Sequence, residues 1–236
     1  MKIDGIVLPI PLRQNLTSIH DASSVGKDNI HKVYIILRKI KTEKVCSFLP
    51  LSFVISLGKD KEGRIMDFCE LAKARYSVRK FDSKPIEEEK LQKVLEAGIV
   101  APTAKNYQPF RIYVIQSEEA MNKIKEVSKC TYGAPVVLMF TYDLTEEWMN
   151  PIDPSCTSGQ QDASIAATHV MLQAADLGLG TCWVNMFDPT LAAELLDIPE
   201  TEIPLLLMPI GYAAEDAVPS PNHTTYRPTE ELVLYL

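Results

Sequence analysis

The residues from Met66 onward predict a globular domain in which helices and strands are mixed. Hydrophobic residues make up 46% of the chain and charged residues 23%, which is typical of a folded globular protein. Amphipathic helical patterns are interspersed with apolar runs that are typical of buried strands, at residues 111–116, 134–142 and 205–211. We therefore expect helices packed around a sheet.

The first 65 residues differ from the rest of the chain in charge. They contain 11 Lys and Arg against 6 Asp and Glu, whereas residues 66–236 contain 13 against 25. Such a shift indicates a boundary near Met66. Lys61-Glu62-Gly63 can be encoded by a purine-rich sequence resembling a bacterial ribosome-binding site before a start codon at Met66. We expect residues 1–65 to be a non-native or poorly ordered N-terminal extension, Met66 to be the true start, and 66–236 to be the functional domain.

Composition argues against several classes of function. The net charge of −7 disfavours general binding to nucleic acid, whose phosphates require a basic surface. The five cysteines are scattered without a C-x-x-C pair, so we expect no metal site. The apolar run 45–57 contains Pro50 and is too short to cross a bilayer, so we expect no membrane association and a cytoplasmic location.

The helices of the domain are predicted from apolar spacing. Residues 66–74 form a short amphipathic helix, and a second helix has Pro85 in its first turn and three glutamates after it. Its expected buried face is formed by Leu91, Val94, Leu95 and Ile99. Ser158 and Gln161 have the capping-box spacing for a long, largely apolar helix that Gly178 and Gly180 terminate. Such a helix belongs in a core or a subunit interface.

The remaining elements follow from local composition. The small residues of 101–110 predict an irregular loop that a ligand can approach closely, and 143–157 predicts a mobile loop containing Trp148. Residues 118–128 and 189–196 are expected to be helical, and 181–187 to be a strand and loop. The proline-rich segment 219–228 precedes the end of the chain.

Positive charge is concentrated at Arg75, Arg79 and Lys80, with Ser77 between the two arginines. Guanidinium groups bind phosphate through a planar fork of donors, and a hydroxyl adds another donor. Alone, such a run is better explained by a solvated basic turn. Its meaning depends on the other motifs of the chain.

Four motifs in order resemble the FMN-dependent nitroreductase family. They are RYSVRKFD (75–82), APTAKNYQPF (101–110), AADLGLGTCWV (174–184) and YRPTEEL (226–232). The resemblance covers residues 66–236 and none of 1–65. It implies an α+β fold with a central, mostly antiparallel sheet flanked by helices, and an intertwined homodimer with FMN in the subunit interface.

The resemblance also implies which residues bind the cofactor. Arg75, Tyr76, Ser77 and Arg79 would contact the phosphate and ribityl chain, and Arg227 would close the phosphate site. A second subunit would contribute Pro102, Thr103, Ala104 and Asn106 to the flavin ring. Residues near the reactive edge of the ring would be Trp183, Val184, Asn185 and Met186. The flavin itself would carry the hydride, so no side chain is expected to be catalytic.

The implied activity is hydride transfer from NADH or NADPH, through the flavin, to a nitroaromatic, quinone or related small-molecule acceptor in two half-reactions. Two alternatives stay open: another flavoenzyme on the same fold, such as a dehalogenase or a flavin-fragmenting enzyme, and a non-enzymatic flavin-binding or sensing module. Met186 stands where the family often has a small or acidic residue, and Thr225 where it commonly has a basic one. Substrate choice is therefore expected to depend on Met186 and the loop 143–157, and phosphate binding mainly on Arg75 and Arg79.

Overall fold

The computed structural model describes residues 2–3, 6–7 and 67–236, and the chain divides into two units, Met1–Ile55 and Ser56–Leu236. In the first unit, strands β1 (Lys2–Ile3) and β2 (Ile6–Val7) pair antiparallel. The expected N-terminal extension and start at Met66 otherwise concern residues outside the described part. Everything below concerns the second unit.

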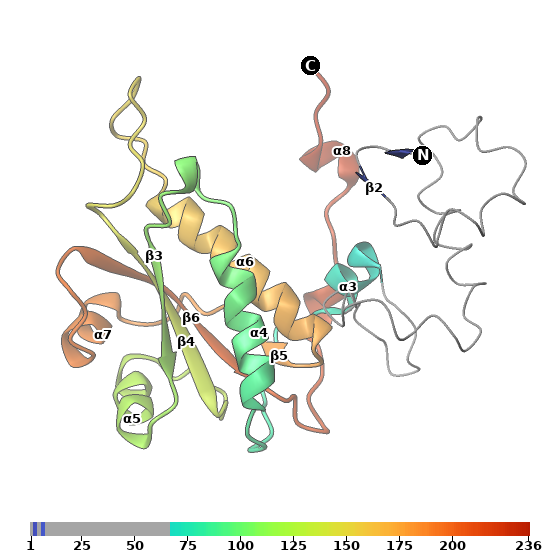
Figure 1. Cartoon of the computed structure of the whole chain (residues 1–236). Helices are drawn as coiled ribbons and strands as arrows, with labels where there is room; N and C mark the ends of the chain where they lie inside the picture. Colours follow the sequence, from blue (N-terminus) through green and yellow to red (C-terminus); the bar gives the residue numbers. More distant parts are fainter. Residues whose placement is uncertain (1, 4–5, 8–66) are drawn as a thin grey trace, which may run out of the picture. The chain divides into compact units, whose positions relative to one another are not determined.

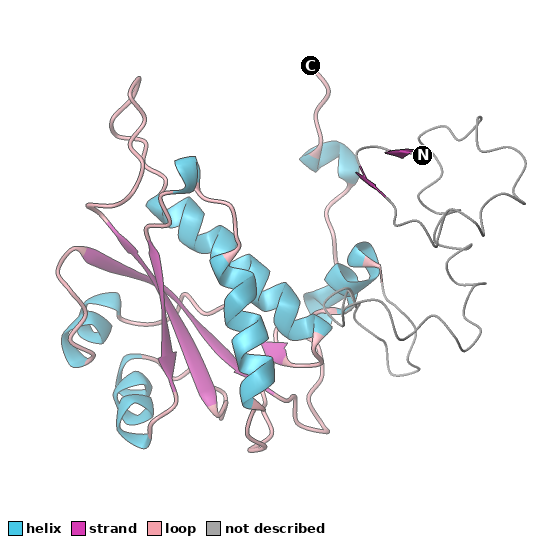
Figure 2. Cartoon of the chain, viewed as in Figure 1, coloured by secondary structure: helices cyan, strands magenta, loops and turns pink. Residues whose placement is uncertain are grey.

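The second unit is built on a four-stranded sheet of order β3-β4-β6-β5, with antiparallel neighbours throughout. The central strands are β4 (Val136–Asp143) and β6 (Glu202–Gly211). The outer strands are β3 (Phe110–Ile115) and the two-residue β5 (Gly180–Thr181). The expected antiparallel sheet flanked by helices is confirmed (Figure 2).

Helices cover both faces of this sheet (Figure 1). One face carries α4 (Glu88–Ile99) and α6 (Gly159–Asp176), and the other carries α5 (Glu118–Val127) and α7 (Pro189–Leu195). The short helices α3 (Phe68–Ala74) and α8 (Thr229–Leu232) lie toward the ends of this unit in sequence. No helix in the described residues is long and apolar enough to cross a membrane.

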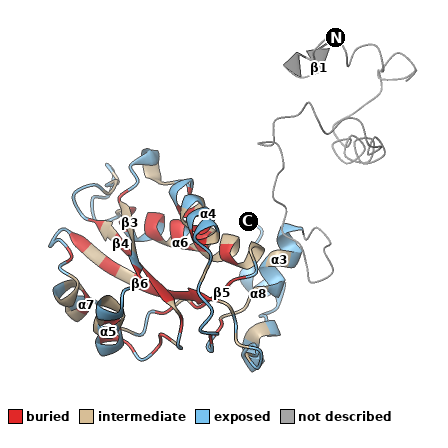
Figure 3. Ribbon diagram, turned by 60° about the horizontal axis from the view of Figure 1, so that its bottom comes forward, coloured by how far each residue is buried: buried red, intermediate tan, exposed pale blue. Residues whose placement is uncertain are grey.

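Alternation along β4 explains why the strand reads as one continuous apolar run. Val136, Leu138 and Phe140 pack toward α4 and α6, whereas Val137 and Met139 pack toward α5 and α7. Successive side chains of a strand point to opposite faces, so a strand covered on both sides needs apolar residues at every position. Figure 3 shows the resulting concentration of buried residues in the central strands.

Three local expectations are wrong. The second helix begins at Glu88 after an N-cap at Glu87, so Pro85 lies before it rather than in its first turn. Ile99 is 60% exposed at the helix end, although Leu91 and Val94 are buried as expected. Ser158 is the N-cap residue of α6, but its side chain caps no backbone N–H of the helix.

Candidate functional site

The basic segment, residues 75–79, lies along the edge of the sheet. Ser77 forms a parallel bridge with Thr181, and the Val78 N–H donates to the Thr181 carbonyl at 2.9 Å. The Val78 side chain is 2% exposed, while Ser77 is half-buried and Arg79 exposed. Alternation therefore buries Val78 as an anchor and leaves the polar side chains of the segment facing outward.

The close approach of this segment depends on Gly180. A Cβ atom built at Gly180 would lie 2.5 Å from Val78 Cγ2, which no real contact tolerates. Glycine is thus required by packing, whereas the sequence indicated it only as part of a helix terminator. The repeated glycines of the G-L-G motif were the only hint of this requirement in the sequence. The requirement at position 180 comes from Val78, which is far away in the chain, so it could not be predicted locally.

Backbone bonds also hold the segment that follows the arginines. The Asp82 N–H donates to the Tyr212 carbonyl at 2.8 Å, and the Ala214 N–H donates to the Lys80 carbonyl at 3.0 Å. Phe81 bridges Ala213 and is buried. The arginines are consequently carried on a backbone that is fixed at both ends.

Cys182 lies beneath the basic segment. Burial raises the pKa of the Cys182 thiol, while the positive charge of Arg79 and a hydrogen bond with Ser77 act in the opposite direction. A buried thiol of raised pKa is a poor nucleophile. The structure therefore supports a packing role for Cys182.

The run after β5 is fixed to the central strand β6. Val184 exchanges two backbone hydrogen bonds with Leu207, at 2.9 and 3.0 Å, and is 4% exposed. The Trp183 indole N–H donates to the Asn185 side chain at 3.0 Å, and the Ser128 hydroxyl donates to the Met186 carbonyl at 2.7 Å. The Met186 side chain is 70% exposed. Residues 183–186 thus continue the sheet edge at which Ser77 pairs with Thr181.

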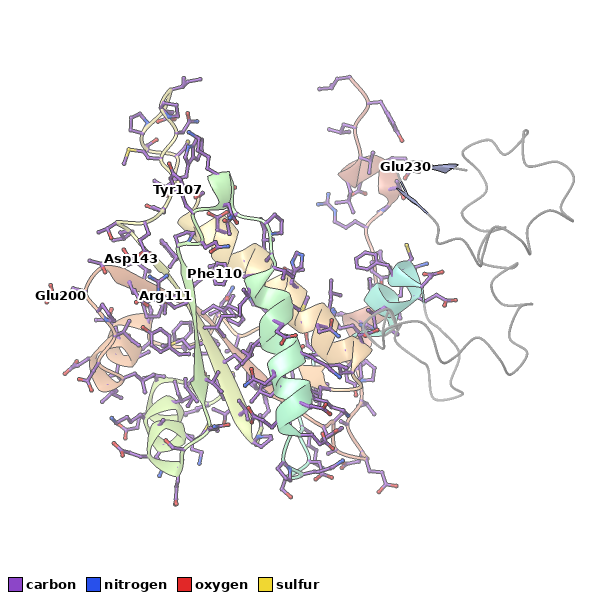
Figure 4. The ribbon with its side chains drawn as sticks, in the orientation of Figure 1. Tyr107, Phe110, Arg111, Asp143, Glu200 and Glu230 are labelled. Carbon is purple, nitrogen blue, oxygen red and sulfur yellow. The ribbon has the colours of Figure 1, made fainter. Side chains whose placement is uncertain are left out.

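The loop 101–110 borders a cavity at the beginning of α6. The cavity has a volume of about 420 Å³ and is lined by Pro102, Thr103, Ala104, Trp148, Asn150, Cys156, Thr157, Ser158, Gln161, Asp162 and Ile165. Asn106 is exposed and does not line it. Figure 4 shows Tyr107, from the same loop, lying beyond Phe110 and Arg111 at the start of β3.

Asp162 is the buried acid of this cavity, with 2% of its surface exposed. In the structure it lines the cavity, and its Oδ1 atom accepts the Ala104 N–H at 3.0 Å. Ser158 donates to its Oδ2 atom at 2.7 Å. Neither bond was expected, because Ala104 lies 58 residues from Asp162 in the sequence and the capping-box pattern directs the Ser158 hydroxyl to a backbone N–H instead.

The two groups of predicted cofactor-binding residues lie at opposite ends of α6. Loop 102–106 forms a hydrogen bond with Asp162 in the first turn of α6. The basic segment pairs with β5, which follows the last turn of α6. The helix has 18 residues, so these ends are about 27 Å apart at 1.5 Å per residue. One chain therefore does not assemble these residues into a single site.

Arg227 is placed differently from the other predicted phosphate ligands. Its Nε and Nη2 atoms donate to Glu231 Oε2 at 2.9 and 2.7 Å, four residues along the chain. The C-terminal segment nevertheless reaches the basic segment, because the rings of His223 and Tyr76 meet edge to face with centroids 6.1 Å apart.

Comparison with known proteins agrees with this architecture. The sequence model of the nitroreductase family matches residues 72–132 and 128–212. A Methanothermobacter thermautotrophicus protein, provisionally named NADH dehydrogenase/NAD(P)H nitroreductase, is 33% identical over 64% of this chain and 80% of its own. A nitroreductase family structure from Clostridium difficile 630 is 36% identical, with a TM-score of 0.68 over 72% of this chain and 98% of its own.

A further solved structure, described as an FMN-dependent nitroreductase from Clostridium difficile R20291, is 27% identical. Its TM-score is 0.53 over 66% of this chain and 96% of its own. The fold and these relatives thus identify an α+β oxidoreductase. More specifically, the chain belongs to the nitroreductase family.

Proposed function

We propose that this protein is an FMN-dependent oxidoreductase that transfers hydride from NADH or NADPH to a small-molecule acceptor such as a nitroaromatic compound or a quinone. The basic segment carries the proposal, because its anchored backbone presents Arg75, Ser77 and Arg79 beside residues 183–186. Family membership and the description of the Clostridium difficile R20291 relative support the choice of FMN.

The phosphate of FMN would bind Arg75, Ser77 and Arg79, with Tyr76 beside them. A dianionic phosphate in a protein of net charge −7 requires local cations. Within residues 67–236, neither Arg75 nor Arg79 forms a salt bridge. Arg227 would have to break its hydrogen bonds with Glu231 before its guanidinium group could bind the phosphate.

The flavin ring would lie against Trp183, Val184, Asn185 and Met186. The hydrogen bonds of Val184 to Leu207 fix this backbone, while the exposed Met186 side chain remains available to contact the acceptor. When bound, the flavin supplies the hydride-transfer chemistry. The two substrates would use the same open ring face in turn, and solvent would supply protons.

The site would be completed by a second copy of the chain in a homodimer. Pro102, Thr103, Ala104 and Asn106 lie about 27 Å from the basic segment along α6, too far for one mononucleotide to contact both groups. Two antiparallel α6 helices related by a two-fold axis would place the loop of one subunit beside the basic segment of the other. Such isologous pairing creates two equivalent sites.

A cytoplasmic location fits the cysteine chemistry. Cys69, Cys130, Cys156 and Cys182 are free thiols in the described residues, and free thiols are typical of proteins in a reducing compartment.

The first test is spectroscopic. Purified protein should be yellow, should release FMN on denaturation, and should lose its flavin absorbance when NADH or NADPH is added without oxygen. Addition of a quinone should restore the absorbance. A colourless protein that cannot be reconstituted with FMN would exclude the proposed function.

The phosphate assignment is tested by replacing Arg75 and Arg79 together with alanine. Charge-assisted hydrogen bonds contribute about 1.5–3 kcal/mol each, so FMN affinity should fall on the order of a hundredfold or more. A matched control replaces Lys123 and Lys125 on α5, which removes the same charge from outside the basic segment. Fluorescence titration of the apoprotein with FMN measures both, and unchanged affinity in the arginine variant would contradict the assignment.

A further inference from the structure

The loop beside the cavity has an unusual backbone. Lys105, Asn106 and Gln108 have φ angles of 50°, 58° and 53°, in the left-handed region. Residues other than glycine rarely adopt this backbone conformation, which costs about 1–3 kcal/mol for each such residue. Three such residues within four positions need surrounding contacts that hold the loop in this shape.

Bonds within the loop supply part of this restraint. The Gln108 N–H donates to Thr103 Oγ1 at 3.1 Å, and the Gln108 side-chain amide donates to Asn106 Oδ1 at 3.1 Å. The Asn106 N–H donates to the Thr103 carbonyl at 3.0 Å. These bonds close the loop on itself but do not attach it to the domain.

Asp162 provides an attachment to the domain. Its Oδ1 atom accepts the Ala104 N–H at 3.0 Å, immediately before the left-handed residues. Its Oδ2 atom accepts the Ser158 hydroxyl at 2.7 Å, and the same hydroxyl oxygen accepts the Trp148 N–H at 3.1 Å. The carboxylate therefore joins the loop to the hairpin 148–158, which forms the opposite wall of the cavity.

We propose that Asp162 is a positioning residue, which holds loop 103–108 in its left-handed form and fixes that loop relative to Trp148 across the cavity. This inference rests on the proposed function, in which the same loop approaches the flavin of the second subunit. Asp162 acts through Ala104 and Ser158, each of which donates a hydrogen bond to one of its carboxylate oxygens. The attachment made by Asp162 would give the cavity a preformed wall, against which the cofactor and an aromatic acceptor entering beside Trp148 can bind.

The chemistry favours a carboxylate at this position. Two donors, one backbone N–H and one hydroxyl, converge on the two oxygens of a side chain that is 2% exposed. An ionised acceptor forms stronger hydrogen bonds than a neutral one. Asparagine keeps an acceptor for Ala104 but offers the Ser158 hydroxyl a donor instead, while alanine removes both acceptors.

Amide hydrogen exchange tests the attachment without any cofactor. In Asp162→Ala, the Ala104 and Trp148 amides should exchange about tenfold faster or more, because each loses a restraint. In Asp162→Asn, the Ala104 amide should stay protected. Ser158→Ala should expose the Trp148 amide and leave that of Ala104 protected. The control is Asp176→Asn at the other end of α6. Within the described residues the Asp176 side chain accepts a hydrogen bond only from Gln173, so this change should alter the exchange of neither amide.

FMN affinity then distinguishes a residue that positions the loop for the cofactor from one that only stabilises the fold. Asp162→Ala should weaken FMN binding about tenfold or more and raise KM for the acceptor more than it lowers kcat, and Asp162→Asn should restore FMN affinity. Unchanged Ala104 exchange in Asp162→Ala would overturn the inference, as would faster exchange with unchanged FMN affinity. A wild-type chain that binds no FMN would overturn the proposed function alone. Amide exchange would then still decide whether Asp162 holds the loop.

Discussion

At Gly180, the absence of one methyl group allows a buried valine to lie against the sheet. A Cβ atom at position 180 would lie 2.5 Å from Val78 Cγ2 and 3.0 Å from Val78 Cβ. Both atoms belong to a β-branched side chain with little freedom to rotate away. The backbone of the basic segment must therefore move if position 180 acquires a side chain.

The substitution Gly180→Ala should destabilise the domain by roughly 1–3 kcal/mol, as overpacking does in other cores. It should also lower FMN content, because it displaces Arg79 and Ser77 together with Val78. Urea unfolding and flavin absorbance measure the two effects. The matched control is Gly180→Ala combined with Val78→Ala, which restores room; the pair should be less destabilising than the sum of the single changes. Strict additivity would show that the predicted contact does not matter.

Single residues also show where sequence reasoning succeeds. Leu91 and Val94 were predicted to be buried from helical spacing alone, and both are. Spacing cannot tell where the sheet beneath a helix ends, so Ile99, on the same stripe, was predicted incorrectly. Ser158 has the capping-box pattern, but a competing carboxylate at Asp162 takes its hydroxyl.

Among the elements, β6 was the least predictable from its sequence. It begins at Glu202, three residues before the expected start, and contains Pro204 and Pro209. Proline in a central strand normally argues against the assignment. Here Pro204 pairs with Thr141 where the β4–β6 register shifts, and the buried Glu202 carboxylate accepts the hydroxyls of Tyr113 and Thr141. Both compensations come from other strands, so they are invisible in the local sequence.

The connection leading into α4 is fixed to the end of β6 by a charged cluster. Tyr212 donates its hydroxyl hydrogen to Glu87 Oε2 at 2.5 Å, and the Lys84 ammonium lies 4.1 Å from the centre of the Tyr212 ring. The Lys90 ammonium donates to the Tyr212 hydroxyl oxygen at 2.7 Å. This cluster stands beside the backbone bonds that fix residues 80–82.

The cluster predicts a pH dependence. The Tyr212 hydroxyl, with smaller contributions that include Lys84 and Lys90, lowers the pKa of Glu87 from 4.5 to about 2. Since the folded pKa lies below the unfolded value, this stabilisation is fully present above about pH 4.5 and is lost as pH falls toward 2. In Tyr212→Phe, the pKa of Glu87 should rise toward its ordinary value. NMR titration of the Glu87 carboxyl measures it, and an unchanged midpoint would rule out the hydroxyl as the main cause.

For the molecule as a whole, four separated motifs were enough to predict the antiparallel sheet and the family. They could not show how the motifs are distributed in space. Loop 102–106 and the basic segment are separated by the length of α6, which becomes visible only once the helix is placed. The assignment of both to one flavin therefore depends on the proposed dimer.

Complementation between two defective chains tests that dimer. One chain carries Arg75→Ala with Arg79→Ala, and the other carries Ala104→Trp, which fills the loop side of the cavity. Each alone should bind little FMN. Mixed dimers, refolded together and isolated by two affinity tags, should regain one intact site and thus about half of the wild-type flavin, since each subunit supplies one half of each site. Mixed dimers as empty as their parents would argue against a shared site.

The length of α6 has a thermodynamic consequence in the proposed dimer. If each flavin is held by two chains, cofactor binding and subunit association are linked, and each strengthens the other by the same free energy. Dilution would then release the cofactor even though no residue that contacts it had been replaced. Conversely, a supply of FMN would decide what fraction of the chains is paired. The 18-residue length of α6 would in this way couple the oligomeric state of the protein to the concentration of its cofactor.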